Sequence, residues 1–303
     1  MGRVDLKRIL VFIAISYATG IFIDLVVFLA GINPLTHVMG DLWAFSRMWS
    51  VTLSSFVCVL LHRESIGTML RSFLVLSRKT AVYYFLWSPL IVYITIGIYV
   101  MIASPLGLFD LGAITEVLVR EVNDLPGIRI EQVLLLYVFP IGYLLAITLH
   151  ALYALGEEIG WRGYLYNVLG AKPTLTNTII VGSVWSLWHA PAILLFGLNY
   201  GINRLAGILI FIPFCVAHTY SYLYTTTKSK SVLPAASLHG TLNSLWVLMT
   251  WKTSRIPMEQ RELLLGLGIL GTIAWSVTSI FLYAIHKFIH ITEIGIKKYF
   301  FMK

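Results

Sequence analysis

Charged residues are scarce in this sequence, and their scarcity excludes an ordinary water-soluble fold. Only 12% of the 303 residues are Asp, Glu, Lys or Arg, whereas roughly a quarter of an average soluble domain is charged. Hydrophobic residues make up 58% of the chain, and the mean hydropathy is +0.83. Because so few polar side chains cannot cover the surface of a soluble protein, lipid must solvate much of the chain.

Cysteine is nearly absent as well. The two cysteines, Cys58 and Cys215, each lie in an apolar segment, and no CxxC pair occurs. This pattern excludes a disulfide framework and a cysteine-based zinc site. We interpret both thiols as small buried apolar side chains.

Long apolar runs are abundant, and they predict an all-α polytopic membrane protein with about eight transmembrane helices. The run after Lys7 and Arg8 continues to about residue 30, which is too long for a signal peptide, so we expect a retained first helix. The segment 63–79 is shorter and basic on one side, which is typical of a helix lying in the membrane interface. The predicted spans are 9–31, 41–61, 81–103, 132–156, 175–196, 204–226, 231–250 and 263–286.

The net charge of +8 indicates membrane topology rather than nucleic-acid binding, because Lys and Arg collect between the apolar segments. They are concentrated at both ends of the chain and in alternate connections. Since cytoplasmic connections carry the excess of basic residues, we predict that both termini face the cytoplasm, as an even number of spans requires.

Polar side chains inside the predicted spans form three groups, and such groups usually mark a function because burying them in lipid is costly. The first group is Glu157-Glu158-x-x-x-Arg162. Glu158 and Arg162 are four residues apart, so they share a helix face and can pair, whereas Glu157 points about 100° away. By itself, the group is equally typical of a salt-bridge cluster at a helix end.

The second group is Trp185-x-x-x-His189, and the third is His239-x-x-x-Asn243. The spacing places both members of each group on one helix face. Taken singly, either group is also typical of an interhelical polar contact. Together with Glu157 they supply the carboxylate, imidazole and amide groups that activate water and stabilise a tetrahedral intermediate. We therefore expect the three groups to converge on one site.

Three other polar residues in the spans are predicted to be structural. Asp24 in the first span and Arg47 in the second are expected to pair as a clamp between helices. His218, in the sixth span, is interpreted as a helix contact.

The three groups, in this order on successive helices, resemble the motifs of the type II CAAX prenyl endopeptidases. These belong to the wider family of CAAX-processing and bacteriocin-processing membrane proteases. The resemblance covers about residues 155–245, and Trp185 stands where the family usually has Phe. It divides the chain into N-terminal helices (1–130), a CAAX-protease-like catalytic core (131–250), and a last helix with a basic tail (251–303).

The resemblance implies a role for each group. Glu157, aided by His189, would activate a water molecule, while His239 and Asn243 would form an oxyanion hole. The remaining motif residues would support the site; they are Glu158, Arg162 and Trp185.

A zinc ion is compatible with these residue types, since one Glu and two His can bind zinc. However, the sequence holds no HExxH pair. We therefore favour metal-independent glutamate chemistry without a cofactor.

The predicted function is intramembrane endopeptidase cleavage near the C-terminus of membrane-tethered substrates. The sequence does not distinguish between prenylated CAAX-type peptides and unprenylated precursors as substrates. Membrane lipid is the other expected partner. A transporter or proton relay is the alternative from another class, although no paired repeat halves occur. A non-catalytic scaffold is a third. Because no retention signal is evident, we predict a prokaryotic plasma membrane, with the site opening toward the cytoplasm.

Overall fold

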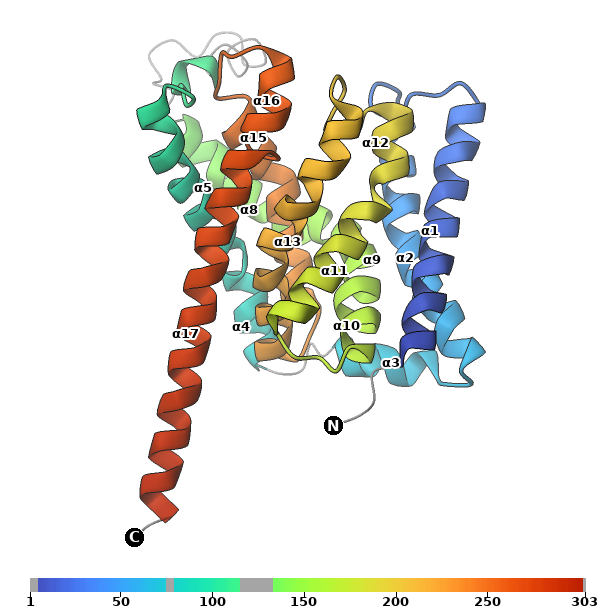
Figure 1. Ribbon diagram of the computed structural model, residues 1–303, viewed down its shortest axis with the longest axis vertical. Coiled ribbons are helices and arrows are strands. Elements are labelled where there is room, and N and C mark those ends of the chain that lie inside the picture. The colour runs from blue at the N-terminus through green and yellow to red at the C-terminus, as the bar shows by residue number, and fades with distance from the viewer. Residues whose placement is uncertain (1–4, 75–78, 115–132, 302–303) are drawn as a thin grey trace.

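Long helices form a membrane bundle in the computed structural model, which describes residues 5–74, 79–114 and 133–301 (Figure 1). In these ranges every regular element is a helix. Seven helices are long and apolar enough to cross a membrane, which confirms the prediction of an all-α polytopic membrane protein. They are Leu6–Leu29 (α1), Gly40–Leu61 (α2), Lys79–Leu106 (α4 and α5), Leu136–Val168 (α8 to α10), Leu175–Phe196 (α11 and α12), Arg204–Ser229 (α13) and Met258–Phe288 (α16 and the first part of α17).

The eighth predicted span, 231–250, is also a helix, running from Leu233 through Trp251. It consists of α14 (Leu233–Thr241), a π-helical turn (Leu242–Trp246) and α15 (Val247–Trp251). It is too polar to count among the seven apolar helices, but all of α14 after its first residue is buried in protein. The start of α1 and the end of α17 (Ile269–Phe301) lie at the same end of the bundle (Figure 1), which agrees with eight crossings.

The fourth span differs from its prediction at its C-terminal boundary. We expected it to end at residue 156, but the helix continues through Val168, so the Glu157–Arg162 motif lies inside a helix and is buried. The sequence placed the motif at the end of the span but in continuous helix, and the continuous helix is confirmed. Glu158 and Arg162 are accommodated inside the bundle because they pair with each other there.

The predicted interfacial segment is shorter than expected. It appears as α3 (Ile66–Phe73), with Met69 and Phe73 buried and Arg71 exposed, while residues 75–78 lie outside the described part of the chain. This arrangement has the apolar and basic sides expected of an interfacial helix. Most of the predicted connection 104–131 also lies outside the described residues.

Irregular helical turns occur at all three sequence motifs. A π-helical turn, Ile159–Leu165, follows Glu158 directly, and another, Leu242–Trp246, contains Asn243. The helix of the second motif breaks at His189, between α11 (Leu175–Trp188) and α12 (Ala190–Phe196). Two further π-helical turns, Leu134–Val138 and Ala146–His150, lie away from the motifs, so these turns accompany the candidate site without defining it.

The predicted pair of Asp24 and Arg47 is confirmed. Arg47 Nε lies 3.0 Å from Asp24 Oδ1, and both side chains are buried. Arg47 also donates from Nη2 to the Trp188 carbonyl oxygen at 2.6 Å, and its guanidinium lies 3.7 Å from the centre of that indole ring. The clamp therefore holds the end of α11, the residue before His189.

We expect Arg47→Met alone to destabilise the protein by roughly 3–5 kcal/mol, because it leaves the Asp24 carboxylate buried without its partner. The double variant Asp24→Leu/Arg47→Met should lose much less stability than the single variant, since it leaves no buried charge without a partner. Thermal unfolding in detergent measures both. A double variant at least as unstable as the single one would contradict this interpretation.

Candidate active site

A cavity of about 200 Å³ lies among α11, α13, α14 and the turn that follows α14. The structure brings Trp185, His189, His239 and Asn243 together in its wall, as the spacing of the second and third motifs predicted. The other lining residues are Asn199, Phe211, Phe214, His218, Leu242, Trp246, Val247 and Leu267. The cavity therefore combines three imidazoles and two amides with an otherwise apolar and aromatic wall.

Each of the three imidazoles is anchored through Nδ1. His189 Nδ1 lies 2.9 Å from the Trp185 carbonyl oxygen, and His218 Nδ1 lies 2.7 Å from that of Phe214. His239 Nδ1 lies 2.8 Å from Glu158 Oε1. Because carbonyl and carboxylate oxygens accept hydrogen bonds, each Nδ1 carries the proton, and Nε2 of the neutral ring keeps a lone pair. All three rings can thus act as bases.

Glu158 links the first motif to the third. Its Oε1 accepts from Arg162 Nη1 at 3.0 Å, which confirms the predicted pairing four residues apart, and also from His239. The Arg162 guanidinium is fully buried and lies between two rings, 4.1 Å from the centre of Trp185 and 4.3 Å from that of Tyr222. The carboxylate and the two ring faces together stabilise this cation in the membrane interior.

Glu157 is held by two indoles. Trp161 donates from Nε1 to Glu157 Oε2 at 3.3 Å, and Trp185 donates from Nε1 to the same oxygen. The side chain is 2% exposed and lies outside the cavity wall. Within the described residues Oε1 accepts no hydrogen bond, so one oxygen is fixed and the other is left for a further partner.

Trp185 occupies the centre of the site. Its ring meets those of His189, His218 and His239 edge-on, with centroid distances of 5.9, 5.0 and 5.2 Å. Its N–H group reaches Glu157, a contact that the Phe usual at this motif position cannot make. The departure from the usual motif therefore adds a hydrogen-bond donor to the site.

Sequence reasoning missed Asn199 and assigned His218 a structural role. Asn199 follows α12 in a left-handed conformation, with φ of +64°, and lines the cavity. Its signal was weak: Asn adopts this conformation more readily than most residues, and it comes two positions after a glycine that ends a helix. His218 lies in the same wall, with Nε2 buried and unpartnered.

Metal-binding residues do not cluster in the described part of the chain, where no three His, Cys, Asp or Glu side chains are grouped to hold an ion. Both cysteines are buried free thiols, and neither lines the cavity.

The cavity reaches the connection between α12 and α13, where Asn199 lies. This connection is at the end of the bundle away from the start of α1 (Figure 1). The cytoplasmic orientation of the chain and of the site stays a prediction.

Residues 131–245 match the family model described as type II CAAX prenyl endopeptidase Rce1-like. A curated relative, CAAX prenyl protease 2 of Methanococcus maripaludis, is 33% identical over 98 residues. That alignment covers 29% of this chain and 34% of the relative, so the chain matches about a third of the relative's length. The resemblance predicted from the three motifs is confirmed, and the family match contains all of them.

Proposed function

We propose that this chain is an intramembrane endopeptidase that cleaves membrane-tethered peptides near their C-termini. The observation that carries the proposal is the convergence of all three motifs of the matched segment. Glu158 binds His239, Trp185 binds Glu157, and His189, His239 and Asn243 line one cavity. The match to the prenyl endopeptidase family supports the reaction class.

Glu157 is the proposed general base. With Oε2 fixed by two indole N–H groups, Oε1 accepts a proton from the water molecule that attacks the scissile carbonyl. His189 assists through Nε2, since its Nδ1 is occupied by the Trp185 carbonyl. Trp185 lines the cavity and donates to Glu157, which does not line it, so the mechanism requires a rearrangement that brings Glu157 into contact with the substrate water.

His239 and Asn243 are the proposed oxyanion hole. The Asn243 amide can donate from its present position in the cavity wall. His239 can donate from Nε2 only in the doubly protonated form of its ring, because its Nδ1 is bonded to Glu158. Arg162 in turn fixes Glu158, so the supporting residues act through the position of His239.

The size of the cavity suggests how a lipidated substrate binds. A volume of about 200 Å³ is smaller than the roughly 300–1,000 Å³ of sites that enclose a drug-sized ligand. We infer that the cavity takes the peptide around the scissile bond, and that any prenyl group stays in the bilayer.

Proteoliposomes containing the protein test this function directly. A fluorogenic farnesylated CAAX peptide and its unprenylated twin are offered side by side, with and without a zinc chelator. We expect cleavage of at least one peptide, insensitive to the chelator. Activity that is lost with the chelator and restored by zinc would overturn the metal-free mechanism.

Proton transfer across the membrane is a second candidate function. It is favoured by the three imidazoles that share one cavity inside the bundle. Absence of peptide cleavage, together with proton flux into the same liposomes, would support this function instead.

The Trp185→Phe variant tests the contact to Glu157. Phe keeps an aromatic ring at this position but removes the N–H donor, so Glu157 retains only the longer bond from Trp161. A hydrogen bond to a charged group contributes about 1.5–3 kcal/mol, so we expect kcat to fall by roughly 10- to 100-fold with KM little changed. Steady-state kinetics of peptide cleavage measure this. Wild-type kcat would show that the indole N–H does not position the base.

A further inference from the structure

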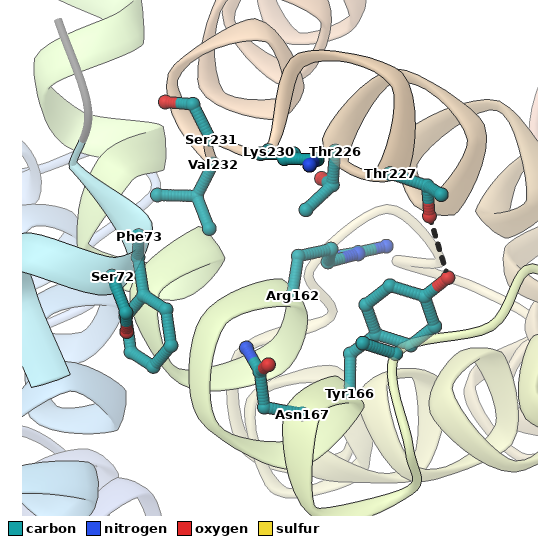
Figure 2. A pocket seen from close by; sticks show the side chains of 11 residues that line it. Ser72, Phe73, Arg162, Tyr166, Asn167, Thr226, Thr227, Lys230, Ser231 and Val232 are labelled. Atoms are coloured by element: carbon teal, nitrogen blue, oxygen red, sulfur yellow. Dashed lines mark hydrogen bonds between the residues drawn. The ribbon is translucent and has the colours of Figure 1, made fainter.

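A second cavity, of about 280 Å³, is lined by Arg162, which is not in the wall of the candidate active-site cavity (Figure 2). Its wall comes from α3, from the turns after Arg162, and from the connection between α13 and α14. These elements lie at the end of the bundle where α1 starts and α17 ends (Figure 1). Nothing in the proposed mechanism uses this cavity.

The described residues that line this cavity include two cations and no acidic side chain. Arg162 is fully buried and Lys230 is exposed, and the other polar lining residues include Asn167, Thr226 and Ser231 (Figure 2). The Glu158 carboxylate that balances Arg162 is not in this wall. The cavity therefore suits an anion.

Two buried polar atoms in the lining residues lack a hydrogen-bond partner. Arg162 Nε and Thr226 Oγ1 are both unsatisfied, and the residues are 0% and 8% exposed. Buried donors without partners are rare in proteins and costly to leave unpaired. An anionic oxygen in this cavity would accept from both groups.

Lys230 adopts an unusual backbone conformation at the rim. It ends α13 in the left-handed region with φ of +55°, a position where glycine is the usual residue. Its side chain is exposed, so burial does not explain the choice of lysine. The left-handed turn therefore places an ammonium group at the exposed edge of a cavity that already contains Arg162.

We propose that this cavity binds the phosphate group of an anionic membrane lipid. Phe73 and Val232 give one side of it an apolar surface beside the polar groups, as a headgroup with adjoining acyl chains requires. The neighbouring helix α3 has the buried apolar and exposed basic sides of an interfacial helix. Anionic lipid phosphates are concentrated at that depth and attract basic residues.

The bound phosphate would act on the candidate active site through three side chains. Arg162 contacts Glu158, and Glu158 contacts His239. An anion bound to Arg162 competes with Glu158 for the guanidinium. The strength of the hydrogen bond between Glu158 and the His239 ring then changes. This coupling rests on the proposed function, whereas lipid binding does not.

Native mass spectrometry of the full-length protein from nanodiscs of mixed phosphatidylglycerol and phosphatidylcholine tests the binding. We expect one retained phosphatidylglycerol in the wild type. Because each basic residue near the membrane surface contributes about 1 kcal/mol to anionic lipid binding, the dissociation constant for phosphatidylglycerol should rise about fivefold in Lys230→Gln, with a matching loss of the retained lipid. Lys228→Gln is the matched control and should keep wild-type occupancy, since Lys228 lies two residues away and outside the cavity wall.

Lys230→Gly separates loss of charge from misfolding. It removes the ammonium group and relieves the left-handed strain, so it should fold at least as well as wild type and still lose the lipid. Equal occupancy in the wild type, Lys230→Gln and Lys230→Gly would overturn the site. Inorganic phosphate is titrated in pure phosphatidylcholine nanodiscs as a separate arm. Suppose that inorganic phosphate binds saturably there, while the protein in mixed nanodiscs retains phosphatidylglycerol no better than phosphatidylcholine. The site would then bind free phosphate, and the proposed lipid would be ruled out.

Discussion

Glu157→Gln is expected to reduce kcat for peptide cleavage by roughly 10²- to 10⁴-fold, the usual contribution of a general base. Gln keeps the size of the side chain and an oxygen that accepts from Trp161 and Trp185, so the fold should be unaffected. What the variant loses is the ability to take a proton from water. Initial rates in proteoliposomes, normalised to folded protein, measure the effect.

Glu64→Gln is the control for the Glu157 variant. Its carboxylate pairs with Arg8 at a half-exposed position far from the cavity, so its activity should match the wild type. Substantial cleavage by Glu157→Gln would eliminate this residue as the base. His239 would then be the strongest candidate, because it lines the cavity and has a carboxylate behind its ring.

Asn243→Ala is expected to lower kcat by about 10²- to 10³-fold with a smaller change in KM, as loss of one oxyanion-hole donor typically does. The side chain is exposed in the cavity wall, so its removal should leave stability close to wild type. Asn243→Asp should be at least as impaired, because it keeps the shape but replaces the donor with a negative charge.

Ser244→Ala is the matched control for Asn243. Ser244 lies in the same π-helical turn, outside the cavity wall, and its hydroxyl donates locally to the Thr241 carbonyl. Its kcat should stay within about twofold of wild type, since surface-type substitutions away from a site have small effects. If Ser244→Ala and Asn243→Ala were equally impaired, the effect would belong to the geometry of the turn rather than to the amide.

Helix spacing and the scarcity of buried charges predicted two contacts correctly. Glu158 and Arg162 pair as two residues on one helix face should. Asp24 and Arg47 pair because two opposite charges buried in neighbouring spans have few other partners. Apolar length likewise predicted the helical class and seven of the eight spans, since the bilayer imposes both helix and length.

Contacts between distant parts of the sequence were not predictable in the same way. The bond from His239 to Glu158 joins residues 81 positions apart, and only tertiary packing determines which carboxylate the imidazole meets. The contact from Trp185 to Glu157 depends on the same packing. The end of the fourth span was misplaced because hydropathy does not register that buried ions can neutralise each other within a helix.

The polar character of the helix from Leu233 through Trp251 has a consequence for biosynthesis. A segment carrying His239 and Asn243 gains little from entering lipid alone, so its insertion depends on helices already in place. Its partner Glu158 lies on a helix synthesised earlier. The candidate active site would therefore be completed only after the helix of Glu158 is in place, when the helix of His239 leaves the translocon and docks against that carboxylate.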